Sequence, residues 1–188
     1  MKISQNKLDL IFINVKKSYV TMMSIIFLAT LCSCSGSRVS SSIPCDIKHR
    51  EQHPINTIAM APGGGVLADA IAVALTNKNY KVFDAEQMSN FFMRLNLNEI
   101  EVASPQNLCL LKDKGIDSYL TVKSAAGYDG LPESASVRLN STHDGKVITG
   151  VSWQNGWGGR QTSLCDRVMR KNVLEAAKEI VGELSKNI

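Results

Sequence analysis

The sequence is poor in histidine, and its three histidines form no recognisable metal or acid–base motif. His49 and His53 lie in a polar segment without helical periodicity, and His143 lies in a predicted hairpin turn, so no pair of histidines shares a helix face. His53 with Cys45 could ligate a metal, but the segment is more typical of an exposed loop. We therefore expect no metal and no other cofactor.

Nucleotide-binding motifs are also missing. Gly63, Gly64 and Gly65 stand between a predicted strand and a predicted helix, an arrangement in which backbone N–H groups can bind an anion. However, no Gly-Lys-Ser/Thr follows the run, and no G-x-G-x-x-G spacing occurs. We therefore interpret the three glycines as a tight turn that has no room for side chains.

The apolar run near the N-terminus is too short to span a membrane. The apolar stretch at residues 19–31 is 13 residues long, whereas a membrane span needs about 20. Lys16 and Lys17 precede this stretch and small residues follow it, which is the order of an export signal. The N-terminal segment is therefore predicted to direct export.

The letters LCSC at the end of this stretch place Leu31 three residues before Cys34 and Ser33 immediately before it. This frame resembles the lipobox of bacterial lipoproteins, which Cys32 fits less well because bulky Leu31 would precede it. The resemblance implies a signal peptide at residues 1–33 and, on Cys34, a diacylglycerol thioether and an acylated amino group. Several acyl chains together anchor a protein stably. The alternative is an uncleaved anchor or ordinary secretion.

In such lipoproteins the residue after the cysteine helps to sort the product, and Ser35 in place of aspartate implies the outer membrane. Residues 34–44, rich in serine, predict a flexible tether, and residues 45–188 predict one periplasmic domain. The chain has 21 basic and 17 acidic residues, of which residues 1–33 contain four basic and one acidic. The remainder of the chain therefore has 17 basic and 16 acidic residues. This balance provides no basic patch for nucleic acid.

The first half of the domain alternates predicted strands and helices. The predicted elements are a strand at 56–62, a helix at 66–75, a strand at 80–85, a helix capped by Asp84 and Gln87 with an apolar stripe of Met88, Phe91, Phe92 and Leu95, and a helix from Ser104 to Gly115.

The second half changes to an alternation with period two. It predicts strands at 117–125, 134–140 and 146–154, with a hairpin turn at Asp144-Gly145, and a long helix from Thr162 to Leu184. The expected fold is α/β (an α+β sandwich), with a mixed sheet of about four to five strands that ends in a β-hairpin and about four packing helices.

The segments KGIDSYLTVKS and THDGKVITG carry a loose pattern of positions, namely Asp117, Leu120, Asp144, Gly145 and Val147. Through them residues 56–184 resemble a group of periplasmic lipoproteins that includes the TolB N-terminal domain, the curli secretion lipoprotein and the outer-membrane activators of penicillin-binding proteins. The segment SWQNGWGG is similar to one in small bacterial lipoproteins. Pro62-Gly63 stands where the broader group commonly has Pro-Phe, so no member's partner is carried over.

Residues 152–163, SWQNGWGGRQTS, hold both tryptophans and form the candidate binding segment. Trp153 has the phase of the apolar strand positions, which favours core packing. Trp157 has little apolar company, and Arg160 follows it; both residue types are enriched at the energetic centres of interfaces. Alternatively, the glycines only form a tight connection, and Trp157 folds over the edge of the core.

No Ser-His-Asp or paired-carboxylate motif stands in a recognisable context, which favours a protein that is not an enzyme. The favoured hypothesis is an envelope lipoprotein, held to the membrane by its N-terminal lipid, that binds a periplasmic or envelope protein through its sheet edge or loops. The alternative is an envelope enzyme, for example one acting on peptidoglycan, with an unrecognised site. The sequence leaves the oligomeric state open.

The remaining cysteines are interpreted by their surroundings. Cys109 stands among leucines, so we expect a free, buried thiol. Cys45 and Cys165 could form a disulfide in an oxidising compartment.

Overall fold

The computed structural model describes residues 35–43, 54–95 and 104–188. Its strands are β1 (Arg38–Ser42), β2 (Thr57–Met60), β3 (Lys81–Phe83), β4 (Ser118–Ala126), β5 (Pro132–Ser141) and β6 (Val147–Gln154). Its helices are α2 (Gly65–Thr76), α3 (Ala85–Arg94), α4 (Pro105–Asp113), α5 (Leu164–Met169) and α6 (Val173–Leu184). Among the described residues, no helix has the length and apolar character needed to cross a membrane.

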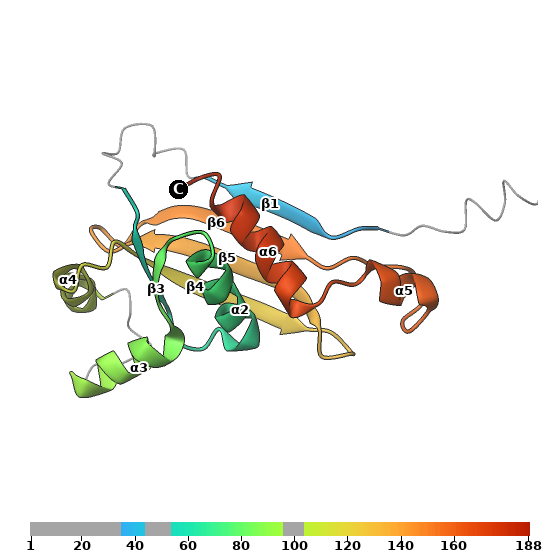
Figure 1. Ribbon diagram of the computed structural model, residues 1–188, viewed down its shortest axis with the longest axis horizontal. Helices are drawn as coiled ribbons and strands as arrows, with labels where there is room; N and C mark the ends of the chain where they lie inside the picture. Colours follow the sequence, from blue (N-terminus) through green and yellow to red (C-terminus); the bar gives the residue numbers. More distant parts are fainter. Residues whose placement is uncertain (1–34, 44–53, 96–103) are drawn as a thin grey trace, which may run out of the picture.

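One mixed sheet organises the chain, in the strand order β1-β6-β5-β4-β2-β3 (Figure 1). Strand β2 pairs in parallel with β3 and β4, and the pairs β4–β5, β5–β6 and β6–β1 are antiparallel. The predicted mixed α+β fold is confirmed, and β1 accounts for a strand that the sequence pattern did not predict.

Helices α3 and α4 begin where local chemistry predicts. Asp84 caps α3 in a capping box, in which its side chain accepts from the backbone of Gln87 at 2.7 Å and the Gln87 side chain accepts from the backbone of Asp84 at 3.3 Å. Ser104 caps α4, and Gly115 follows that helix with a φ of 73°, a left-handed conformation that glycine adopts without strain. These boundaries therefore follow from the sequence.

Two apolar clusters lie on opposite faces of the sheet. Helices α2 and α6 pack side by side on one face and cover the larger cluster (Figure 1). The smaller cluster lies on the other face, with α3 and α4, and contains Ala59, Met88, Phe92, Leu108, Leu111, Ile116 and Tyr119. Leu95, which the sequence pattern placed in the buried stripe of α3, is exposed because the helix ends at Arg94.

The predicted long helix from Thr162 to Leu184 is wrong. The chain forms α5, leaves the helical conformation at Arg170 (ψ 133°), and starts α6 with Asn172 as its N-cap. Asn172 forms a capping box with Glu175, which stabilises a new helix start at this point. The break turns α5 away from the sheet, so that Leu164 and Val168 are exposed.

The predicted flexible tether at residues 34–44 is also wrong over its described part. Strand β1 pairs with β6 along its full length, from Arg38 opposite Gln154 to Ser42 opposite Gly150. The hydroxyl groups of Ser37 and Ser41 donate to Glu179 at 3.1 Å and Glu183 at 2.9 Å on α6. Serine is short and polar, so the composition suggested a linker, but these residues form an edge strand whose hydroxyl groups bond to the covering helix.

Candidate interaction surface

Trp153, one of the three candidate binding residues, belongs to the core. Its side chain is 1% exposed, as the strand phase predicted. The indole Nε1 donates to Glu179 Oε2 at 2.8 Å, and Glu179 also pairs with Lys171. Burial opposes ionisation of Glu179, but hydrogen bonds from Lys171, Trp153 and Ser37 outweigh it and lower the pKa of the carboxyl.

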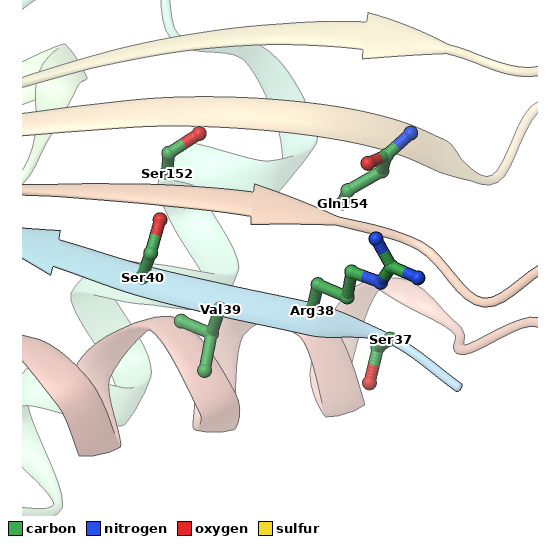
Figure 2. A pocket seen from close by; sticks show the side chains of 6 residues that line it. All are labelled: Ser37, Arg38, Val39, Ser40, Ser152 and Gln154. Atoms are coloured by element: carbon green, nitrogen blue, oxygen red, sulfur yellow. The ribbon is translucent and has the colours of Figure 1, made fainter. Parts of the chain in front are cut away.

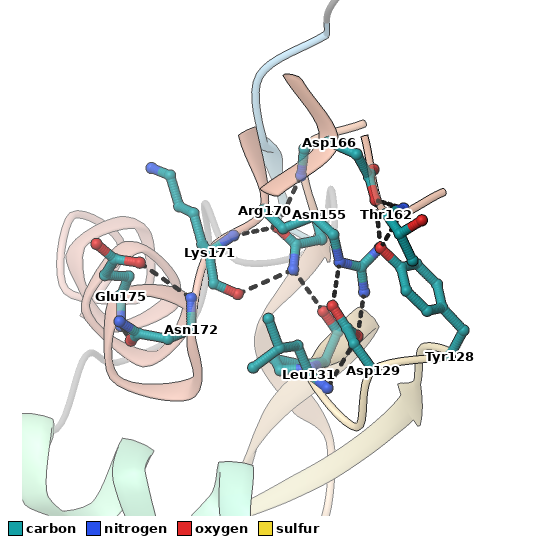
Figure 3. A network of polar contacts seen from close by, with 12 residues as sticks. Tyr128, Asp129, Leu131, Asn155, Thr162, Asp166, Arg170, Lys171, Asn172 and Glu175 are labelled. Carbon is teal, nitrogen blue, oxygen red and sulfur yellow. Dashed lines mark hydrogen bonds and ion pairs between the residues drawn. The ribbon is translucent and has the colours of Figure 1, made fainter. Parts of the chain in front are cut away.

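The segment after β6 is clamped by Asn155, which is buried (Figure 3). Its Nδ2 donates to the carbonyl oxygens of Pro132 at 2.7 Å and Lys171 at 3.0 Å, and its Oδ1 accepts from the backbone N–H groups of Gly156 at 2.8 Å and Lys171 at 2.7 Å. One amide therefore joins the start of β5, the segment after β6 and the α5–α6 junction.

Asp166 of α5 lies fully buried beneath the same segment (Figure 3). Its Oδ2 accepts from the Tyr128 hydroxyl and from the Thr162 backbone N–H at 3.2 Å. The bond from Tyr128, with those from the backbone of Thr162 and Gly158, lowers the pKa of Asp166, and the same bond raises the pKa of Tyr128. Thr162, held by these bonds, has a φ of 69°, which is uncommon for a β-branched residue.

Arg170 closes the network from the other side. Its guanidinium group donates to Asp129 in a bidentate pair at 2.8 and 2.9 Å and lies over the Tyr128 ring, 5.0 Å from the centroid. The Arg170 side chain is only 6% exposed. This pair fixes the β4–β5 hairpin loop against the end of α5, because a bidentate fork restricts orientation as well as distance.

Two glycines allow the closest backbone contacts of this region. A Cβ at Gly156 would lie 2.1 Å from the carbonyl oxygen of Met169, and a Cβ at Gly158 would lie 2.3 Å from the carbonyl carbon of Cys165. The backbone that approaches these glycines is that of the chain's own helix α5. The glycines thus form the tight strand-to-helix connection that was the alternative interpretation.

Trp157 does not fold over the core, as that alternative required. Its side chain is 53% exposed, and Arg160 is exposed as well. Leu164 and Val168, one helical turn apart on α5, are 81% and 80% exposed. We define the α5 surface as the five exposed residues Trp157, Arg160, Leu164, Arg167 and Val168.

The backbone of Trp157 pairs with Ser35, far away in the sequence. The N–H of each residue donates to the carbonyl oxygen of the other, at 2.8 Å in both cases. Cys34, the predicted lipidation site, lies outside the described residues and is covalently bonded to Ser35.

A second candidate surface is the face of the sheet that α2 and α6 leave uncovered. The register aligns polar side chains across β1, β6, β5 and β4 on this face: Arg38, Ser40, Ser42, Ser152, Gln154, Ser134, Ser136, Arg138, Thr121 and Lys123. Its charged members are all cations, and these strand positions include no Asp or Glu. A shallow groove of about 620 Å³ runs over β1 and β6, and Figure 2 shows Arg38 and Gln154 at one end of it.

The glycine run forms a turn, as interpreted from the sequence. Gly63 and Gly65 have φ values of 88° and 63°, and a Cβ at Gly64 would lie 2.5 Å from that of Ala68. The nearby hollow of about 760 Å³ is lined by three carboxylates, which repel a phosphate: Asp69, Asp84 and Glu86.

The remaining sequence candidates have separate outcomes. Cys109 is a free cysteine, as predicted, but the prediction that it is buried is wrong, because α4 buries Leu108 and Leu111 and turns Cys109 outward. Cys45, His49 and His53 lie outside the described residues, so the pairing of Cys45 with Cys165 stays a prediction. In the part of the chain that the structure describes, no group of three His, Cys, Asp or Glu residues could hold a metal ion.

No protein-family model matches the chain, and neither does any curated protein. Among solved structures, lipoprotein GNA1162 from Neisseria meningitidis is similar at 19% identity, over 69% of this chain and 98% of that one, with a TM-score of 0.44. A PelC dodecamer from Paraburkholderia phytofirmans matches at 12% identity over 77% and 96% (TM-score 0.41), and the LpoB C-terminal domain from Salmonella enterica at 12% over 57% and 87% (TM-score 0.38).

Proposed function

We propose that this protein is an envelope lipoprotein, anchored to the outer membrane through Cys34, that works as a protein-binding or assembly module and not as an enzyme. We group it, as part of the same proposal, with the small bacterial lipoproteins that carry a SWQNGWGG segment. The lipobox frame at LCSC supports the anchor. The open face of the sheet supports the binding function.

The observation that carries the binding proposal is the set of charged and hydroxyl side chains on that face. Lys123 of β4 and Arg138 of β5 are exposed on adjacent strands, and Arg38 is exposed on the edge strand β1. Short hydroxyl side chains lie between these cations. A cationic, hydroxyl-lined surface is complementary to an acidic protein surface, because charge complementarity steers encounter and hydroxyl groups donate and accept at close range. The partner that fits is therefore a protein with an acidic patch.

Charge reversal tests this proposal. The full-length chain, expressed with its leader and cross-linked in intact cells, is purified with its lipid, and its covalent partners are identified by mass spectrometry. The double variant Lys123→Glu with Arg138→Glu should lose a specific partner that the wild type captures, and the captured partner should present an acidic surface.

Lys178→Glu is the matched control, because Lys178 is an exposed lysine of α6 on the opposite side of the sheet. It should capture the same partner as the wild type. If the double variant also keeps that partner at wild-type yield, the open face does not bind it. If the purified chain cleaves peptidoglycan fragments, the proposal that it is not an enzyme is wrong.

A further inference from the structure

The place where the lipid would join the domain is fixed by the pair between Ser35 and Trp157. Two backbone hydrogen bonds of 2.8 Å hold Ser35 against the segment after β6, and β1 begins three residues later. Cys34 precedes Ser35 directly, so no free linker separates the predicted acyl chains from the folded domain. The domain therefore meets the bilayer at the end that carries Trp157.

The α5 surface lies at this same end. In Figure 1, α5 and the start of β1 lie together at one end of the molecule, and the C-terminus lies toward the other. Trp157, Leu164 and Val168 are each more than half exposed there. Exposure of large apolar side chains to water is unfavourable, whereas their burial at the boundary between lipid headgroups and acyl chains is favourable.

The charges of this end also suit a lipid surface. Residues 155–169 contain two exposed arginines, Arg160 and Arg167, and one acid, Asp166, which is buried and bound by Tyr128. Arginine side chains can reach lipid phosphates while their stems stay in apolar surroundings, and tryptophan concentrates at membrane interfaces. The outward charge of the segment is therefore cationic.

The network beneath the α5 surface makes it rigid enough to dock as a unit. Asn155 clamps the segment before Trp157, and Gly158 allows α5 to pack directly on its backbone. Asp166 and Arg170 then join α5 to the β4–β5 hairpin loop. Little conformational entropy is lost when a surface held in this way binds.

We propose that the α5 surface is the membrane-facing side of this protein and that Trp157, Leu164 and Val168 enter the headgroup region of the bilayer that carries the Cys34 lipid. This inference rests on the proposed lipid anchor. It assigns Trp157 and Arg160 to a lipid partner and leaves the open face of the sheet, with its cations, available to an acidic protein.

Tryptophan fluorescence in vesicles tests the inference. The full lipidated chain is reconstituted into vesicles of phosphatidylethanolamine and phosphatidylglycerol, with and without brominated acyl chains, which quench only nearby indoles. Trp157 should be quenched and its emission shifted to the blue. Trp157→Phe should abolish the quenching, because Trp153 is buried in the core.

The double variant Leu164→Ser with Val168→Ser should stay in the vesicle fraction but lose most of the quenching. Val73→Ser, at an apolar position on α2 that is 59% exposed, should behave like the wild type. Mass spectrometry of the N-terminal peptide separates the two proposals. An unmodified Cys34 overturns the anchor together with the inference, whereas a lipidated, vesicle-bound chain with unquenched Trp157 overturns only the inference. Protection of Trp157 from a soluble quencher by an envelope protein, and not by lipid, also overturns it.

Discussion

Gly158→Ala should destabilise the protein by inserting one methyl group between two backbones. The added Cβ would lie 2.3 Å from the carbonyl carbon of Cys165 and 2.4 Å from the backbone nitrogen of Asp166. Ordinary van der Waals contact begins near 3.4 Å, so the two backbones must separate by about 1 Å. Overpacking of this kind costs about 1–3 kcal/mol, and Gly158 has no positive φ that would add strain.

The matched control is Gly182→Ala, because Gly182 lies inside α6 and a Cβ there would have nothing within 4 Å. Alanine should stabilise that helix by roughly 0.5–1 kcal/mol. At about 2–4 °C per kcal/mol, thermal unfolding followed by circular dichroism should show a lower melting temperature for Gly158→Ala and a slightly higher one for Gly182→Ala. If Gly158→Ala has the same melting temperature as the wild type, the segment after β6 does not pack on α5 as described.

Four further predictions concern the supports of the fold and the accessible thiol. Trp153→Phe removes the hydrogen bond from the indole N–H to the Glu179 carboxylate and should lower the free energy of unfolding by about 2 kcal/mol. A urea titration measures this, and an unchanged midpoint would contradict the prediction. Since the pKa of Glu179 is lowered in the folded state, its contribution is complete above its ordinary value of 4.5 and disappears as the pH falls through the lowered pKa; Glu179→Gln should flatten that acid limb of the stability curve. Arg170→Lys should speed amide hydrogen exchange in the 127–131 loop by removing the bidentate pair with Asp129, and exchange at the wild-type rate would show that the pair does not hold the loop. Cys109 should react with a thiol reagent in the native protein nearly as fast as in urea, whereas slow native labelling would place it in the core.

Features set by near neighbours in the chain were predictable. The capping box of Asp84 and Gln87, the Ser104 cap and the turn at Gly145 each depend on residues a few positions apart, so the sequence alone locates them. The alternation in β5 and β6 places Trp153 in the core for the same reason, because side chains two apart share one face of a strand. The composition around Trp157 left two interpretations open, an exposed loop residue and a side chain folded over the core edge, and only the tertiary structure, in which the side chain is 53% exposed, distinguishes them.

Features that depend on distant partners were decided by the tertiary structure. Nothing local in RVSSS distinguishes a linker from β1, because its hydrogen bonds come from β6 and α6, more than 100 residues later. The end of α5 at Arg170 depends on Asp129 and Asn155, which draw the 170–171 backbone and side chain away from a helical path. Only that break exposes Leu164 and Val168, and only the pair between Ser35 and Trp157 brings the predicted anchor beside them, since both require contacts that no pattern of nearby residues encodes.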